Sequence, residues 1–221
     1  MKERPIIFNT NMVKAILEGR KTQTRRVVKE KLISEQAEFE CGNRPNVTRS
    51  EPSLQYYIDN GCPFGQIGDR LWVRETFRFY NSDECPHADF PCSCPRNGTP
   101  LFKASHDCGD GEKWKPSIHM PRWASRILLE ITNIRVERLN DISQADSSKE
   151  GIVDGCCLRC RFEACRCKDR QPDLIQGFAR EWSNENGFFP TEKWVSYGGK
   201  AWRDNPWVWV VEFKVIQGGE S

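Results

Sequence analysis

The residues of this chain best suited to chemistry lie in one short run, "GRKTQTRR", at residues 19–26. The run offers an amine at Lys21, a hydroxyl at Thr24 and a guanidinium at Arg26. A guanidinium holds phosphate or carbonyl oxygens, and a Thr hydroxyl becomes a nucleophile where a nearby base removes its proton. The same residues are also typical of a solvated edge strand. The pattern therefore leaves open a grip on a polar ligand, a catalytic group, or a basic strand edge.

A carboxylate in an unusual position is the second candidate. In "GQIGDRLWVRETF", strand periodicity puts Glu75 on the same face as Leu71 and Val73. A carboxylate on the apolar side of a strand needs a charged partner, or solvent at the strand end. Glu75 could thus serve a site, or it could pair with Arg74 or Arg126 for purely structural reasons.

The 11 cysteines offer a third kind of chemistry, which is metal binding. In a reducing compartment thiols stay free, and four thiolates bind zinc tetrahedrally. The candidate ligands form two groups: Cys157, Cys160, Cys165 and Cys167, and more loosely Cys85, Cys92, Cys94 and Cys108, with His87 and His106 near the second group. We expect structural zinc, because metal binding would order two loops of little apolar content. Free surface thiols, or pairing between the two groups, are the alternatives.

Composition narrows the class of protein. Lys and Arg total 33 against 31 Asp and Glu, so any basic surface for nucleic acid must be local. No apolar run approaches the roughly 20 residues of a membrane helix, and the start "MKERPIIFNT" lacks the long apolar segment of a signal peptide. We therefore expect a cytoplasmic protein without a membrane partner.

The first elements must position the "GRKTQTRR" run. A short strand is predicted at residues 5–8, and a helix with apolar residues at helical spacing follows Asn9 or Thr10. Gly19 stands where a helix commonly ends. The β-branched stretch "TQTRRVV" then predicts a strand directly after the turn. Lys21 would therefore lie between a helix end and a strand start.

The later elements complete a mixed domain. Strands are predicted at residues 70–77, at 127–139 as one bent strand or two, and at 205–216, where the first half is expected to be central in a sheet. A polar helix that starts near residues 141–143 and an amphipathic helix around Phe178 lie between the last two strands. Several strands with few helices fit an α+β domain built on a small β-barrel.

Two cysteine-rich stretches interrupt this pattern. They occupy residues at about 78–113 and 153–171, and they contain much Gly, Pro, Asn and Asp with little apolar periodicity. We therefore interpret residues 1–221 as a single domain with two insertions.

The order of the motifs resembles the ASCH domain of the PUA-like superfamily. The resemblance is carried by "ILEGRKTQTRR", "GDRLWVRE" and "RILLEI" with "IRVERLNDI", and the closing "WVWVVEFKVI" is similar to the last strand of phage and prophage members. It implies a small PUA-like β-barrel with flanking helices. The family pattern Gly-x-Lys-x-x-Glu-x-Arg maps onto Gly19, Lys21, Thr24 and Arg26, with Thr24 in place of the usual Glu.

That replacement is similar to an amidohydrolase branch of the family, which removes acetyl groups from acetylated cytidine with the motif Gly-x-Lys-Thr-x-Thr-x-Arg. Lys21, Thr22 and Thr24 match the motif of this branch. Its members are about half as long as this chain. The branch also needs a Glu from a later strand, for which Glu75 is the candidate. The resemblance thus implies Lys21 as the base for Thr24, with Glu75 orienting the amine or moving a proton.

A binding module is the commoner function that the resemblance implies, because PUA-like domains recognise RNA, a nucleotide or a modified base. An unstacked base would lie against aromatic or Arg planes, while basic residues near the run, Arg25 among them, contact phosphates. The candidate ligand-binding residues are Arg26, Thr22, His119 and Arg122, with Trp72, Trp123 and Trp202 available for stacking. His119 lies between prolines and could equally lock a turn. Hydrolysis of N4-acetylcytidine is the alternative function, and a phage-associated interaction protein with structural zinc is the third.

Overall fold

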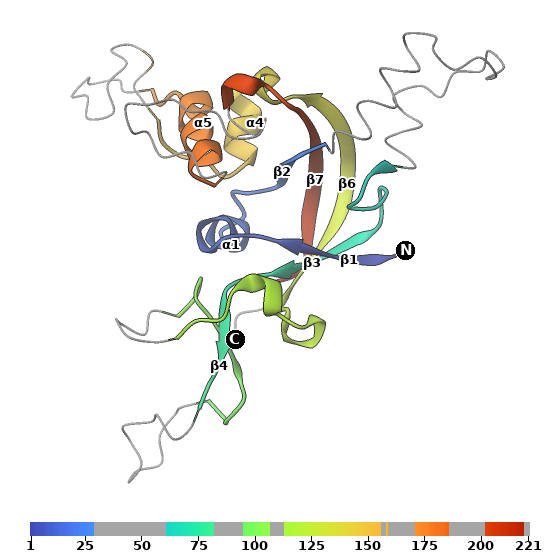
Figure 1. Ribbon diagram of the computed structural model, residues 1–221, viewed down its shortest axis with the longest axis vertical. Coiled ribbons are helices and arrows are strands. Elements are labelled where there is room, and N and C mark those ends of the chain that lie inside the picture. The colour runs from blue at the N-terminus through green and yellow to red at the C-terminus, as the bar shows by residue number, and fades with distance from the viewer. Residues whose placement is uncertain are drawn as a thin grey trace, which may run out of the picture.

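Five of the described strands form one curved sheet with helices on both faces (Figure 1). The computed structural model describes residues 1–28, 61–81, 95–106, 113–155, 158, 171–185 and 202–218. The sheet has five strands in the order β1-β3-β6-β7-β2, in which β1 and β3 are parallel and the other neighbours antiparallel. Its strands are β1 (Glu3–Ile7), β2 (Gln23–Val27), β3 (Arg70–Arg74), β6 (Ile127–Arg138) and β7 (Trp207–Gly218). The predicted α+β class is therefore confirmed.

The helices are short and lie between the strands in sequence. They are α1 (Thr10–Leu17), α4 (Gln144–Lys149) and α5 (Leu174–Glu185), with single 3-10 turns η2 (Ser117–His119), η3 (Arg122–Ala124), η4 (Leu139–Asp141) and η5 (Trp202–Asp204). No helix in the described ranges is long and apolar enough to cross a membrane.

The two edge strands approach each other without pairing. Nη2 of Arg26 in β2 donates a hydrogen bond of 2.6 Å to the carbonyl oxygen of Ile7, the last residue of β1. Within the described residues no hydrogen-bond ladder joins β1 to β2, so the sheet is open, whereas a closed barrel was expected. The reason is that β1 is short and the chain turns into α1 directly after Phe8.

Local sequence explains the turn that carries Lys21. The side chain of Asn9 caps α1 by accepting a hydrogen bond of 2.8 Å from the Met12 N–H. Gly19 follows the helix in the left-handed region, with a φ of 73°. The predicted order of strand, helix, turn and strand around Lys21 is confirmed.

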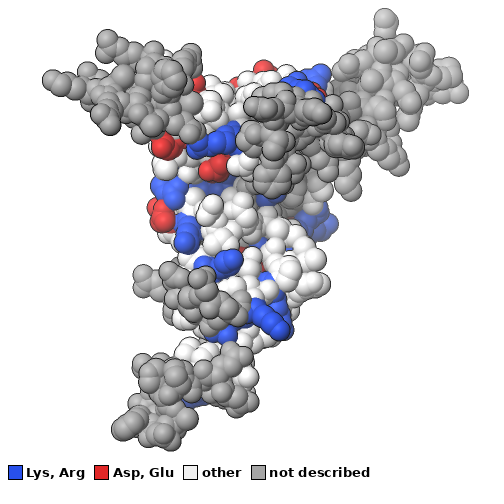
Figure 2. Space-filling view, turned by 60° about the vertical axis from the view of Figure 1, so that its left-hand side comes forward, with Lys and Arg blue, Asp and Glu red and all other residues white. Residues whose placement is uncertain are grey.

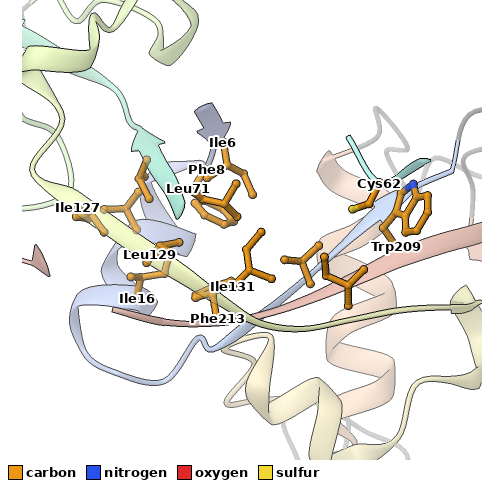
Figure 3. Close-up of a cluster of buried hydrophobic side chains, with 14 of the residues drawn as sticks. Ile6, Phe8, Ile16, Cys62, Leu71, Ile127, Leu129, Ile131, Trp209 and Phe213 are labelled. Atoms are coloured by element: carbon orange, nitrogen blue, oxygen red, sulfur yellow. The ribbon is translucent and has the colours of Figure 1, made fainter. Parts of the chain in front are cut away.

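Side chains of β7 alternate between the two faces of the sheet, and each face has its own core. On one face, here called the α1 face, Trp209, Val211 and Phe213 pack with residues of β1, β3 and α1 (Figure 3). On the opposite face, here called the α5 face, Val208 and Val210 pack with α5 and with the residues that flank α4. β7 pairs with β6 on one side and β2 on the other, which confirms that its first half is central.

A bulge in β6 keeps its apolar side chains on the α1 face. The pairing with β7 shifts between Ile131 and Asn133, and the core contacts continue at Ile134. An extra residue in one strand reverses the alternation of its side chains. As a result Arg135 and Glu137 project on the α5 face, where Arg135 lies opposite Val210.

A hairpin that sequence analysis did not predict lies within the first insertion. β4 (Phe77–Phe79) pairs antiparallel with β5 (Pro100–Phe102), and a further bridge joins Phe77 to Lys115. The hairpin has a small core of its own, formed by Phe77, Phe102, Met120 and Ala124. Residues 82–94, 107–112, 156–157 and 159–170 lie outside the described ranges.

Candidate functional site

Lys21 is buried and ion-paired. Only 1% of the residue is exposed, and its Nζ lies 2.6 Å from Oε2 of Glu150. The same Nζ donates a second hydrogen bond, of 2.9 Å, to the backbone carbonyl oxygen of Glu150. An ammonium has three N–H groups, so one of them lacks an acceptor among the described residues. Lys21 is therefore a fixed positive charge with one donor to spare.

Glu150 connects Lys21 to a wider ionic network on the α5 face. Its Oε1 accepts a hydrogen bond of 3.0 Å from Nη1 of Arg25, whose side chain is fully buried. Arg25 also pairs with Glu137, and with Asp146 at 3.6 Å. The guanidinium of Arg25 is thus ion-paired with buried and partly buried carboxylates. The expectation that Arg25 contacts phosphates was wrong, because its side chain points into the protein.

Thr24 points to the opposite face from Arg25. It lies across from Val211, which belongs to the core of the α1 face, and only 1% of the residue is exposed. Its hydroxyl has no hydrogen-bond partner in the described part of the chain. Buried polar groups in proteins are nearly always hydrogen-bonded, and an unsatisfied one costs about 1–3 kcal/mol. Thr22, by contrast, is exposed.

Phe8 contacts both the side chains from β2 and its preceding turn and the backbone at the end of β3. Its ring centroid lies 5.9 Å from Nζ of Lys21 and 5.3 Å from the guanidinium carbon of Arg26. The Phe8 N–H donates a hydrogen bond of 3.1 Å to the carbonyl oxygen of Arg74, which extends the parallel pairing of β1 with β3. The next residue along the two strands brings Phe8 beside Glu75.

Glu75 lies on the buried face of its strand, as predicted, and is 1% exposed. Of the two partners considered, it pairs with Arg126, which donates from Nε to Oε1 at 3.0 Å and from Nη2 to Oε2 at 3.1 Å. Burial raises the pKa of Glu75, and the neighbouring Arg126 opposes that rise. The pairing means that Glu75 has a structural role whatever else it does.

Of the predicted groups, Lys21 and Arg26 lie over the Phe8 ring. Thr24 lies across from Val211 on the α1 face, and Glu75 pairs with Arg126. Among the described residues no hydrogen bond joins the Thr24 hydroxyl to an amine or a carboxylate. The contact between nucleophile and base that hydrolysis requires is not formed in this arrangement.

The remaining ligand-binding candidates lie on the surface. His119 is exposed, and Arg122, with 43% of its side chain exposed, forms a 2.9 Å ion pair with Glu3 of β1. Met120 between them is fully buried, and its sulfur accepts a 3.4 Å hydrogen bond from the backbone N–H of Glu75. The segment therefore supports the Glu75 position through Met120.

The predicted zinc ligands lie outside the described residues. These are Cys157, Cys160, Cys165 and Cys167 in one group and Cys85, Cys92, Cys94 and Cys108 in the other. Within the described ranges no cluster of metal-binding side chains occurs. Cys62, which is described, is a buried free thiol whose pKa is raised by burial.

Glu150 is the site residue that sequence reasoning missed. It lies 129 positions after Lys21, directly beyond the end of α4. The only local signal is the Gly151 that follows it, with a φ of 92°, which is typical of a helix end. That signal locates the end of the helix but does not reveal that the carboxylate turns inward to an amine.

The chain is similar to two solved structures. No family model and no curated protein matches the chain. A solved structure of a DUF984 family protein from Enterococcus faecalis aligns with 100% of this chain and 84% of its own, at 9% identity and a TM-score of 0.39. An ASCH domain from Lactobacillus crispatus aligns with 98% of this chain and 80% of its own, at 16% identity and a TM-score of 0.34.

The second of these structures is an ASCH domain, the family that the motifs resemble. The TM-scores are too low to carry an argument about function. The assignment to phage-type members stays a prediction.

Proposed function

We propose that this protein binds a nucleobase or nucleotide, free or within RNA, on the α1 face where β1 and β2 meet. The observation that carries the proposal is the Thr24 hydroxyl, which is buried without a hydrogen-bond partner among the described residues. A bound base carries donors and acceptors on its edges and can satisfy such a hydroxyl. The spare N–H of Lys21 would meet an acceptor of the same base.

Arg26 beside this hydroxyl suits such a ligand. Its planar guanidinium, which lies over the buried Phe8 ring, can hold a carbonyl or phosphate oxygen. A ligand would enter between the edge strands, because the Arg26 contact with Ile7 is made by one side chain and can open without breaking a strand ladder.

Binding can be tested with matched threonine variants from the same run. Cytidine, N4-acetylcytidine, uridine and their monophosphates would be titrated by calorimetry into wild type, Thr24→Val and Thr22→Val. We expect Thr24→Val to weaken binding about 5- to 30-fold, because it removes one hydrogen bond without changing side-chain volume greatly. Thr22→Val should bind like wild type, because Thr22 is exposed. Absence of binding by every nucleoside and nucleotide, or equal affinity of Thr24→Val and wild type, would refute the proposal.

Hydrolysis of an acetylated base is the second candidate function. It is favoured by a buried carboxyl group with a raised pKa, Glu75, on the same face as the unpartnered Thr24 hydroxyl. In that reaction the Thr24 oxygen attacks the acetyl carbonyl, the C–N bond breaks, and the amine leaves with a proton. Water then releases acetate from the Thr24 ester. Because Lys21 donates to Glu150, Lys21 could accept the Thr24 proton only after giving one to Glu150.

Turnover separates the two functions. Acetate release from N4-acetylcytidine would be followed for wild type and for Thr24→Val, with Thr22→Val as the control. Loss of turnover in Thr24→Val alone supports hydrolysis. Binding of N4-acetylcytidine by wild type without any acetate release leaves the binding function and ends the hydrolytic one.

A further inference from the structure

We infer that the surface around Trp123 binds a single-stranded nucleic acid, with an unpaired base stacked on the indole ring. This inference goes beyond the proposed pocket, because it uses other residues and a different part of the surface. It concerns η3, the β4–β5 hairpin and the segment that begins at Lys113.

Trp123 is held in place and yet open to solvent. Its ring stacks on Phe79 of β4, with a centroid distance of 5.3 Å and an interplanar angle of 11°. Phe79 is fixed in turn by an edge-on contact with the buried Phe77, also at 5.3 Å. Trp123 nevertheless remains 69% exposed, so the ring face away from Phe79 is accessible. A rigid, solvent-facing indole is the platform on which an unpaired base can stack.

Two cations belong to the surroundings of this platform. The Nζ of Lys115 lies 5.2 Å from the centroid of Phe79, on the ring that supports Trp123. Arg122 precedes Trp123 in η3 and has 43% of its side chain exposed, although it also pairs with Glu3. Next to Lys115 in sequence, Trp114 has the guanidinium of Arg78 5.8 Å from its ring centroid.

Over residues 74–126 the sequence is close to neutral, with eight Lys or Arg and seven Asp or Glu. Residues 74–81, 95–106 and 113–126 contain eight Lys or Arg and one acidic residue, Glu75, which is buried against Arg126. Figure 2 shows Lys and Arg patches on the lower part of the visible face, with the acidic patches mainly above them. The acidic residues of 82–94 and 107–112 lie outside the described ranges. Phosphates would therefore be met by individual described cations such as Lys115, and not by a net positive charge of the region.

The combination fits a single strand better than other partners. A duplex keeps its bases stacked internally and offers no free base to an exposed indole, whereas a single strand exposes base faces. A membrane surface would be favoured by a broad apolar face, whereas here each described aromatic ring of the platform is in contact with a cation or another ring.

Fluorescence anisotropy with labelled oligo(U) and oligo(dT) of roughly 12 nucleotides tests the inference, with a duplex of equal length as the comparison. We expect binding of at least one single strand, and Trp123→Ala should weaken it about 5- to 100-fold. Ile67→Ala should have no effect, because it removes a 66% exposed apolar side chain from another part of the surface. Lys115→Ala should lower the slope of log affinity against log salt by about 0.7, and Lys149→Ala on α4 should not.

Three results would overturn the inference: no single-strand binding at low salt, equal affinity of Trp123→Ala and wild type, or binding of the duplex as tightly as of the single strand. The nucleoside titration keeps the two proposals apart. Trp123→Ala should keep wild-type affinity for nucleosides, whereas Thr24→Val should keep most of the affinity for oligonucleotides. Failure of either proposal therefore leaves the other one testable.

Discussion

The polar residues on the two faces of β2 differ in how they are satisfied. On the α5 face, Arg25 is surrounded by carboxylates, and one of them, Glu150, also holds Lys21 of the preceding turn. On the α1 face, Thr24 is just as deeply buried and has no hydrogen-bond partner among the described residues. The two groups are adjacent in sequence, so neither composition nor burial accounts for the difference.

This contrast is the basis on which we assign a structural role to Arg25 and propose a binding role for Thr24. Buried charges are tolerated when they are paired and hydrogen-bonded, and both Nη atoms of Arg25 meet that condition with Glu150 and Glu137, although its Nε has no partner among the described residues. A buried hydroxyl without a partner lowers stability and is expected where a ligand supplies the missing bond. Lys21 belongs to both groups, because Glu150 holds it while its Nζ also lies near Phe8. The network on one face thus positions the amine for the other.

The largest effect is expected from breaking the network itself. Glu150→Ala would leave Lys21 and Arg25 buried without their shared carboxylate, which should lower the free energy of unfolding by about 3–5 kcal/mol. Denaturant unfolding would measure it. Glu18→Ala is the control, because its side chain is 54% exposed and pairs with the exposed Arg20, so less than about 1 kcal/mol is expected. A loss of similar size in both variants would contradict the distinction between the two faces.

The next effect concerns the buried pair on the α1 side and depends on pH. Arg126→Met leaves the Glu75 carboxylate buried without its partner, at an expected cost of about 3 kcal/mol at neutral pH. Burial already raises the pKa of Glu75 above its ordinary 4.5, so the folded protein binds this proton more tightly than the unfolded chain does. The stability of the variant should therefore rise relative to wild type as pH falls through the raised pKa of Glu75, and the gain should be complete below 4.5, where the unfolded chain also binds the proton.

Unfolding measured at several pH values would detect this trend. The double variant Glu75→Gln with Arg126→Met serves as the control, since it has no carboxylate at this position and should lack the trend. If the free energy of unfolding of Arg126→Met stayed below that of wild type by the same amount at every pH, the carboxylate would not be buried as described.

A smaller effect is expected where the edge strands meet. Arg26→Met removes the hydrogen bond to Ile7 but keeps an apolar stem beside Phe8, and should cost about 2 kcal/mol. Backbone amides of β1 should exchange with solvent faster as a result, which hydrogen exchange would measure. Lys14→Met, at an exposed position of α1, should leave that exchange unchanged. Unaltered protection of β1 in the Arg26 variant would mean that the edges are held together by other contacts.

The smallest effect on stability is expected at Thr24, and it tests most directly whether the two faces of β2 differ in how their polar groups are satisfied. Thr24→Val removes an unsatisfied hydroxyl, so the free energy of unfolding should stay unchanged or rise by up to about 1 kcal/mol. Thermal and denaturant unfolding beside Thr22→Val would measure it. A clear loss of stability in Thr24→Val would indicate that the hydroxyl has a partner within the protein.

Most secondary structure near the site could be predicted, because it follows from neighbouring residues. Asn9 caps α1 and Gly19 follows its end through contacts that span one helical turn. Alternation along β3 was enough to place Glu75 on the buried face. The hairpin of β4 and β5 escaped prediction because its strands are three residues each and lie in a stretch dominated by turn-forming residues.

Sequence alone was thus sufficient for the α+β class, the turn that carries Lys21 and the inward direction of Glu75. The tertiary structure was needed for the partners: Glu150 for Lys21, Arg126 for Glu75, and none among the described residues for Thr24. It was also needed to show that the sheet stays open between β1 and β2. The physical reason is range, since caps and alternation act within a few residues, whereas these ion pairs depend on how segments 51 and 129 residues apart pack together.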